Sequence, residues 1–269
     1  MFVAPKKILM SSSGQVKEET YKRVKTILVS QAKPEKAAPY LELEKKYSLK
    51  IDWRSFIHVE GIGVKEFRKN RIHPEEFSAV IFTSKNAIDH FFRICEELRV
   101  KMPIETKYFC ITEAIANYLQ KFIIFRKRKV FSGARSIEDL GPSLKKHKGE
   151  KYLLPCSNLG AKEVTQYLDD NGFNWKDAVM YNTVSSDLSD LSDVTYDVLV
   201  FFSPQGIESL YDNFPDFKQN ETRIAVFGNT TRQAVEEKGL MANIQAPSTE
   251  APSMTGALEL YLQKSNKSE

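Results

Sequence analysis

The chain has 269 residues, of which 42% are hydrophobic and 28% charged, and its formal net charge is +4. This length predicts about two domains, and the composition excludes global disorder. The mildly basic charge favours a small anionic ligand and is only weak evidence for a nucleic-acid partner. No apolar run reaches the roughly 18–20 residues that span a bilayer, and no signal-peptide core is present. We therefore expect a cytoplasmic protein that does not bind membranes.

Residues 1–24 are polar and lack periodicity, so they predict a flexible leader. From residue 25 onward, short apolar runs alternate with helical patterns. We expect a helix at 39–47 and strands at 25–31, 52–59, 79–83, 107–111, 122–125, 152–154, 178–184, 198–202 and 224–227. Continuous apolar strands between helices are typical of parallel sheets buried on both faces. The predicted fold class is therefore doubly wound α/β.

Three segments recur in the same order along the chain. AVIFTSKNAIDHF at 79–91 matches VLVFFSPQGIESL at 198–210, and TILVSQ at 26–31 matches YLLPCS at 152–157. CITEAIANYL at 110–119 matches VFGNTTRQAV at 226–235. The separations are all roughly 120 residues, which indicates an internal duplication of one α/β unit.

The repeated blocks share one form, an apolar strand followed by a small polar loop and an amphipathic helix. Ser84 and Ser203 stand where a helix N-cap belongs. Such loops lie at the carboxyl edge of a parallel sheet, where helix N-termini favour anions. A cap alone explains any single loop. Four such loops in two copies favour a cleft between two domains that binds one polyanionic ligand.

The residues that would carry other chemistries are sparse. The three cysteines, Cys95, Cys110 and Cys156, form no C-x-x-C pair, and the four histidines form no metal-binding motif. We therefore expect no disulfide framework and no metal, and we read the histidines as structural or exposed. Cys156 follows a predicted strand and is either a nucleophile or a buried thiol. No Walker loop, G-x-S-x-G elbow or complete G-x-G-x-x-G is present.

A basic run at 126–129, Arg-Lys-Arg-Lys, is the densest charge cluster. The simpler interpretation is a solvated connection after a strand. The alternative is a nucleic-acid contact, which no accompanying RNA-binding motif supports. We therefore expect no nucleic-acid partner.

The motifs VIFTSKNAI, LLPCSNLG, VMYNTV, FFSPQGIESL, FGNTTRQAVEEKGL and APSTEAPSMTGAL together resemble the uroporphyrinogen-III synthase family, over about residues 25–262. The resemblance implies two flavodoxin-like parallel-sheet domains joined by a two-strand linker. Domain 1 would be discontinuous, formed by 25–58 and 187–262, and domain 2 would cover 64–180. Residues 59–63 and 181–186 would form the linker and hinge.

The resemblance also implies an activity. The family's enzyme is a cyclising hydro-lyase of tetrapyrrole and heme biosynthesis, which closes hydroxymethylbilane with inversion of ring D and loss of water. It implies no metal or organic cofactor, and transient contact with the deaminase that makes the substrate. Eight substrate carboxylates would suit the anion-binding loops. We expect a monomer, and the alternative function is a non-catalytic module that binds an anionic metabolite or tetrapyrrole.

Carried over by motif, Tyr181 would donate a proton to the departing hydroxyl or orient it. The expected substrate-binding residues are Thr83, Ser84, Lys85, Asn86, Ser157, Asn158, Ser203, Pro204, Gln205, Gly228, Thr230 and Thr231. Lys85 would contact a propionate or remain solvated. Thr112 and Glu113 stand where the family has a glycine loop, and the Glu113 carboxylate would oppose an anionic ligand.

Overall fold

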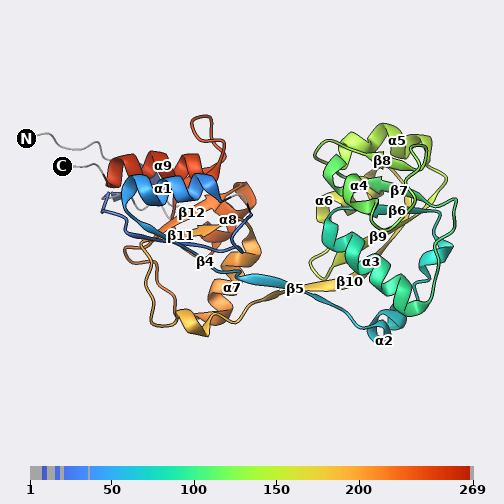
Figure 1. Cartoon of the computed structure of the whole chain (residues 1–269), viewed down its shortest axis with the longest axis horizontal. Helices are drawn as coiled ribbons and strands as arrows, with labels where there is room; N and C mark the ends of the chain where they lie inside the picture. The colour runs from blue at the N-terminus through green and yellow to red at the C-terminus, as the bar shows by residue number, and fades with distance from the viewer. Residues whose placement is uncertain (1–7, 11–15, 19–20, 36, 267–269) are drawn as a thin grey trace, which may run out of the picture. The chain divides into compact units, whose positions relative to one another are not determined.

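The computed structural model describes residues 8–10, 16–18, 21–35 and 37–266 (Figure 1). The chain separates into two compact units. Unit 1 comprises the described residues of Met1–His58 and Val184–Glu269, and unit 2 comprises Val59–Thr183. The chain passes from one unit to the other within strands β5 (Ile57–Gly61) and β10 (Asn174–Ser185).

Unit 1 contains a five-stranded parallel sheet in the order β13-β12-β11-β3-β4. Its strands are β3 (Thr26–Val29), β4 (Lys50–Trp53), β11 (Val198–Phe201), β12 (Arg223–Phe227) and β13 (Ala242–Ala246). Its helices are α1 (Ala38–Tyr47), α7 (Pro204–Asn213), α8 (Asn229–Glu237) and α9 (Met254–Ser265), with a short 3-10 turn η4 (Ser189–Leu191).

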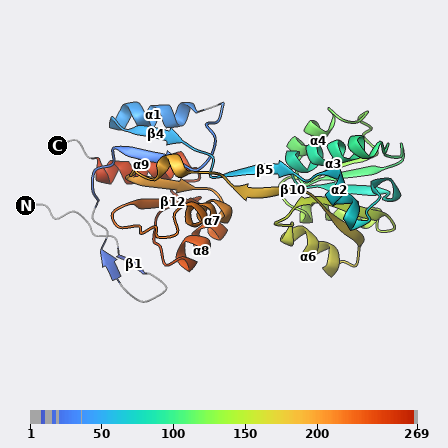
Figure 2. The ribbon, with the colours of Figure 1, turned by 90° about the horizontal axis from the view of Figure 1, so that it is seen from below.

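Both faces of this sheet are covered, because alternate residues of each strand point to opposite sides. Ile27 and Val29 pack in the cluster that includes Leu43 of α1 and Leu258 of α9. Leu28 instead joins the residues of α7 and α8. Figure 2 shows α1 on one side of this sheet and α7 and α8 on the other. The continuous apolar character of the strands follows from this double burial.

Unit 2 contains a six-stranded sheet in the order β5-β10-β9-β6-β7-β8. Its further strands are β6 (Ala79–Phe82), β7 (Lys107–Cys110), β8 (Val130–Ser132) and β9 (Lys151–Ser157). Its helices are α2 (Val64–Phe67), α3 (Lys85–Leu98), α4 (Glu113–Leu119), α5 (Gly141–Lys146) and α6 (Lys162–Asp170). Three 3-10 turns complete the described part of this unit, η1 (Arg68–Asn70), η2 (Pro74–Glu76) and η3 (Glu138–Leu140).

The sheet of unit 2 is likewise covered on both faces. Val80 and Phe82 pack in the cluster that includes α3 and α4, whereas Ala79 and Ile81 pack with α5 and α6. In Figure 2, α3 and α4 lie on one side of this sheet and α6 on the other. The α/β class with two parallel-rich sheets is confirmed.

The sequence repeat corresponds to equivalent sheet positions. In the order β4-β3-β11-β12-β13, the repeated segments form β3, β11 and β12. Their partners in sequence form β9, β6 and β7, which occupy the same places in the order β10-β9-β6-β7-β8. Both orders are the flavodoxin-like 2-1-3-4-5 arrangement once the strands of unit 2 are counted from β9.

Two predicted strands differ from the structure, and two edge strands of the structure were not predicted. The apolar run 122–125 is not a strand, because the parallel partner of Tyr108 in β7 is Val130 of β8. The predicted strand 52–59 is two strands, since β4 ends at Trp53 and β5 begins at Ile57. The edge strands β8 and β13 are absent from the predicted set, because β8 is only three residues long and the ANIQA segment of β13 carries polar residues.

The expected leader, 1–24, lies largely outside the described residues. Within it, β1 (Ile8–Met10) and β2 (Val16–Glu18) pair antiparallel. Val24 is fully buried, and the ring of Tyr21 lies 5.3 Å from that of Tyr261. Packing against unit 1 therefore begins before Lys25, the expected start of the folded chain.

Candidate active site

A pair of hydroxyl groups marks the carboxyl edge of the sheet in unit 2. Ser84 follows β6 and caps α3, accepting a hydrogen bond from the Ala87 amide at 3.1 Å. Its Oγ also lies 3.3 Å from the phenolic oxygen of Tyr181, at hydrogen-bond distance. A residue of strand β10 is thereby joined to the first turn of α3.

Tyr181 is held in an apolar setting. Its register against β9 shifts between Val179 and Tyr181, and the side chain is 7% exposed. Burial raises the pKa of the Tyr181 phenol above its ordinary value, although the hydrogen bond with Ser84 acts in the opposite direction. The group therefore keeps its proton at neutral pH and can donate a hydrogen bond.

His90 of α3 stacks on Tyr181, with ring centroids 5.0 Å apart and planes 21° from parallel. Arg93 donates from Nε to His90 Nδ1 at 3.3 Å. Partial burial, followed by the Arg93 charge, lowers the pKa of His90, and the nearby Asp89 carboxylate opposes that shift. The neutral imidazole is therefore favoured beside the phenol. From the sequence, His90 is interpreted as structural or exposed, and its contact with Tyr181 is not predicted. Nothing in the position of His90 along the chain indicates that the two rings stack.

Gly61 allows α3 to approach β5 closely. A Cβ at this position would lie 2.8 Å from Arg93 Nη2 and 2.9 Å from His90 Nδ1. That Nη2 atom donates to the carbonyl oxygens of Ile62, at 2.8 Å, and Met180, at 3.3 Å. Arg93 thus holds the segment after β5 and strand β10 against α3. Its bond to Met180 also positions the backbone directly before Tyr181.

The loop after β9 is bonded to β10. The backbone N–H of Asn158 donates to the backbone carbonyl of Tyr181 at 3.1 Å. The side-chain Oδ1 of Asn158 accepts from the backbone N–H of Thr183 at 2.8 Å. Ser157 Oγ accepts from the Leu159 amide within the loop at 3.2 Å. Of these two predicted substrate-binding residues, Asn158 therefore orients the strand that carries Tyr181, and Ser157 shapes the loop that holds Asn158.

The other predicted residues of this edge are more open. Lys85 and Asn86 are exposed at the start of α3, and Thr83 is half-buried at the end of β6. The Lys85 ammonium lies 5.4 Å from the ring centroid of Tyr118, whose hydroxyl donates to Asp89. Lys85 is therefore accessible to an anion at this edge of the sheet.

At the corresponding edge of unit 1, Ser203 precedes α7. Ser203 has the extended backbone of an N-cap, yet its side chain makes no capping hydrogen bond in the described structure. Pro204 occupies the first helical turn, where its missing N–H removes no helical bond. Ser203 and Gln205 are half-exposed. The Ser203 hydroxyl is therefore available to a ligand in a way that the Ser84 hydroxyl is not.

Helix α8 begins at the next loop of that edge. Gly228 has a φ of +87° and donates its amide to Ala246 O at 2.7 Å. Thr230 is exposed, whereas Thr231 is 1% exposed and its Oγ1 has no hydrogen-bond partner in the described part of the chain. The first amides of a helix lack intrahelical acceptors, so this turn presents donors to an anion.

The equivalent loop in unit 2 is different. Thr112 caps α4, with its Oγ1 accepting from the Ile115 amide at 3.3 Å, and Glu113 is exposed in the first turn. The hydroxyl satisfies one amide and the carboxylate complements the helix dipole. An anionic ligand is therefore favoured at the start of α8 over the start of α4. The reason is that Thr112 and Glu113 stand at α4 where the family has a glycine loop.

Comparison with known proteins identifies the family of the chain. A family model described as uroporphyrinogen-III synthase HemD matches residues 55–256. The chain belongs to the uroporphyrinogen-III synthase family. A uroporphyrinogen-III synthase from Chlorobaculum parvum is 21% identical in an alignment of 251 residues that covers 87% of this chain and 98% of that protein.

Two solved structures of the same family share the fold. Uroporphyrinogen-III synthetase from Helicobacter pylori 26695 has a TM-score of 0.58 at 20% identity, covering 89% of this chain and 99% of that one. A mutant uroporphyrinogen III synthase from the extremely thermophilic bacterium Thermus thermophilus has a TM-score of 0.56 at 13% identity, covering 91% of this chain and 100% of that one.

Within this member of the uroporphyrinogen-III synthase family, the cysteines are not nucleophiles. All three are free and buried. Burial raises the pKa of Cys156 to about 11 and those of Cys95 and Cys110 to about 12. The thiols stay protonated at neutral pH. Of the two interpretations of Cys156, nucleophile or buried thiol, the structure therefore favours the buried thiol. No cluster of three or more metal-ligating side chains occurs among the described residues.

The two repeat-related serines provide a matched test of capping. Ser84→Ala is expected to lower the free energy of unfolding by about 1 kcal/mol, because the Ala87 amide loses its acceptor. Ser203→Ala is expected to cost less than about 0.5 kcal/mol, because no cap bond is lost. Urea denaturation of both variants checks this. Equal losses would contradict the assignment of the cap to Ser84 alone.

His90 is expected to titrate below an ordinary histidine. In the unfolded chain it binds a proton near its usual pKa, whereas the folded protein resists protonation. Folding stability should therefore fall as the pH drops from about 7 to about 5. NMR titration of the His90 ring measures the midpoint directly. His90→Gln should remove part of the acid destabilisation, and a midpoint above the usual value would refute the inference.

Proposed function

We propose that the protein closes hydroxymethylbilane to uroporphyrinogen III, with inversion of ring D and loss of water. The observation that carries this proposal is the buried Tyr181 phenol, hydrogen-bonded to the capping Ser84 at a sheet edge in a chain that belongs to the uroporphyrinogen-III synthase family. The activity of that family is a hydro-lyase reaction of tetrapyrrole biosynthesis. The substrate class is a linear tetrapyrrole with carboxylate side chains.

The proposed role of Tyr181 is to donate a hydrogen bond to the hydroxyl that leaves the bilane. A phenol with a raised pKa gives up its proton reluctantly. We therefore propose that Tyr181 orients and stabilises the departing oxygen instead of transferring a proton fully. His90 and Ser84 position the phenol, since one stacks on its ring and the other contacts its oxygen.

Binding of the substrate carboxylates is assigned to polar loops in both units. The donors proposed in unit 1 are the first turn of α8, with Gly228, Thr230 and Thr231, and the loop of Ser203, Pro204 and Gln205. In unit 2, Thr83, Lys85 and Asn86 are the proposed contacts, and Ser157 and Asn158 act through the position of β10. Holding a reactive bilane in one conformation can supply much of the rate effect.

We propose that the protein acts as a monomer in the cytoplasm, without a nucleic-acid partner, on substrate made by a deaminase that it contacts transiently. Free, buried cysteines support a reducing compartment. We also propose that 59–63 and 181–186 form the linker between domains made of 25–58 with 187–262 and of 64–180.

A coupled assay tests the function. Porphobilinogen and a hydroxymethylbilane-generating deaminase are incubated with the purified protein, and the oxidised porphyrin isomers are separated. Formation of the type III isomer above the protein-free control is the expected result. If a folded protein yields only type I but binds the bilane, the non-catalytic binding module replaces the synthase.

A further inference from the structure

The connection between α4 and β8 carries unusually exposed apolar side chains. Ile124 is 84% exposed, Phe125 43% and Phe122 38%, and the nearby Ile104 is 73% exposed. Together they line or adjoin a cavity of about 490 Å³, whose wall includes Phe92 and Tyr108. Contiguous apolar exposure of this kind marks an interaction surface.

Exposed positive charges occur on the same connection and on the same cavity wall, which Lys101 and Arg126 line. The exposed cations are Lys101, Lys121, Arg126, Lys127 and Arg128. We call these cations together with Ile104, Phe122, Ile124 and Phe125 the basic apolar patch. Lys129 is not part of it, because its ammonium is buried and pairs with Glu105 at 3.0 Å. Glu96 is the acid that also lines the cavity. The patch therefore has a strong excess of positive charge.

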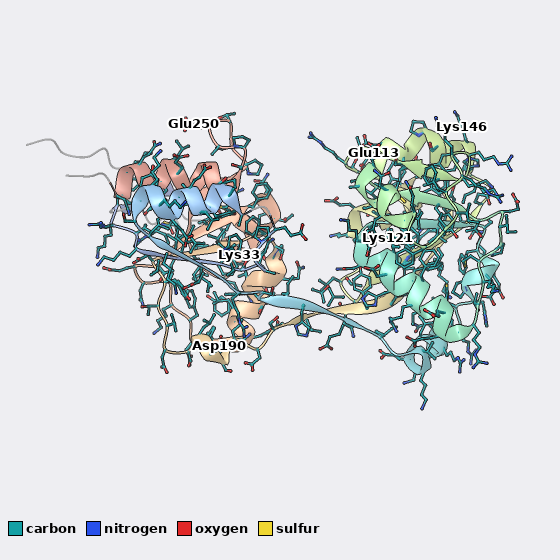
Figure 3. All side chains as sticks on the ribbon, viewed as in Figure 1. Lys33, Glu113, Lys121, Lys146, Asp190 and Glu250 are labelled. Carbon is teal, nitrogen blue, oxygen red and sulfur yellow. The ribbon has the colours of Figure 1, made fainter. Side chains whose placement is uncertain are left out.

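The patch lies away from the candidate active site within unit 2. Helix α4 begins at Glu113, at the carboxyl edge of the sheet, and the chain returns to the amino edge before β8 starts at Val130. Figure 3 labels Glu113 and Lys121, which lie at the start of α4 and just beyond its end. Ile104 precedes β7 at the same amino edge. The contacts of Tyr181 and Ser84 therefore do not explain the patch.

We propose that the basic apolar patch binds the surface of an anionic lipid bilayer. Cations close to an anionic leaflet are attracted to it, and apolar side chains gain by entering the interface. A nucleic acid would use the cations but leave Ile104 and Ile124 exposed. Phe122 is already stacked on Phe92 at 4.9 Å, so its ring is not free to stack on a base.

This association would be peripheral. No helix in the described part of the chain is both long enough and apolar enough to cross a bilayer. The expectation that the protein does not bind membranes depends on the lack of a spanning segment, which has no bearing on a surface loop. The proposal is also independent of the tetrapyrrole chemistry, because it concerns the opposite sheet edge of unit 2.

Co-sedimentation with vesicles tests the proposal. The full chain is expected to bind vesicles of phosphatidylglycerol and phosphatidylcholine mixed one to two, but not pure phosphatidylcholine, and salt should weaken binding. The triple variant Arg126→Gln, Lys127→Gln, Arg128→Gln should bind about a hundredfold more weakly. Ile124→Ser should weaken binding about tenfold without any change in charge.

A charge-matched control distinguishes the patch from net charge. Lys145→Gln, Lys146→Gln, Lys148→Gln removes three exposed cations at the end of α5, where Figure 3 labels Lys146. This control should retain most of the binding. Every variant should keep its circular dichroism spectrum and its type III isomer formation, so failure of the proposed function and failure of membrane binding are read separately.

Three outcomes would overturn the proposal. One is no binding to the anionic vesicles. Another is equal weakening by the control and the patch variant, which would mean that only net charge matters. The third is binding to single-stranded RNA that the patch variant abolishes and Ile124→Ser leaves unchanged, which would assign the basic run to a nucleic acid.

Discussion

Tyr181→Phe is expected to lower kcat for type III formation by about tenfold and to leave KM nearly unchanged. The change removes one hydrogen bond, worth about 1.4 kcal/mol, that is strongest as the hydroxyl leaves. The phenylalanine ring preserves the stacking on His90 and the packing of β10. The coupled assay with varied bilane concentration measures both constants.

Tyr152→Phe is the matched control. Tyr152 is a fully buried tyrosine of unit 2 whose hydroxyl donates to His147 O at 2.9 Å, within the segment that leads into β9. Its loss should affect stability but not kcat. An unchanged kcat in Tyr181→Phe would reject the proposed hydrogen bond to the departing hydroxyl. Equal effects of both substitutions would reduce Tyr181 to a packing residue.

The pH dependence follows from the same phenol. Because burial raises the pKa of Tyr181 above the usual 10.0, ionisation of this group cannot reduce kcat between neutral pH and that value. An alkaline decline below it must come from another group, and Tyr181→Phe should retain it. Ser84→Ala removes the contact that lowers the pKa of Tyr181, so it should not bring ionisation closer to neutrality.

Gly228→Ala is expected to raise KM about tenfold and to lower the free energy of unfolding by about 1–3 kcal/mol. The φ of +87° and ψ of 154° at Gly228 belong to a region that is almost restricted to glycine. A side chain there would force the loop to shift, which would displace the first amides of α8 from a substrate carboxylate. Chemical denaturation and the coupled assay give the two effects separately.

Gly239→Ala separates strain from binding. Gly239 follows the same helix at its C-terminal end and also has a positive φ, of +72°. A Cβ would meet no atom within 4 Å at either glycine. The control should lose stability through backbone strain, while its KM stays near that of the natural protein. A tenfold rise in KM in both variants would contradict a specific role for the start of α8.

Much of the fold is determined locally and is predictable from the sequence. Strands such as 79–82 and 198–201 are apolar at every position, and a helix starts directly after the serine that follows each of them. The repeat indicates two equivalent α/β units because each copy uses the same strand, cap and helix pattern. The capping role of Ser84 and the special backbone of Gly228 follow from the same short-range preferences.

Other features depend on contacts between segments far apart in the chain. The run 122–125 is apolar enough for a strand, but the ladder beside β7 is taken by Val130. Ser84 meets Tyr181 across 97 residues, and His90 stacks on that ring without any marker in its spacing. Ser203 has the same motif position as Ser84, yet its hydroxyl makes no capping hydrogen bond with the helix that follows.

The sequence by itself determined the α/β class, the duplication and the loops with helix N-termini, because these arise from the periodicity and preferences of neighbouring residues. No local pattern records that β3 and β4 join β11–β13 while β9 and β10 join β6–β8; the family resemblance implies such a grouping, and strand pairing in the tertiary structure decides it. The tertiary structure also decided which hydroxyls are engaged and which are available. The physical reason is that strand pairing and side-chain burial depend on packing among distant segments, which no local pattern records.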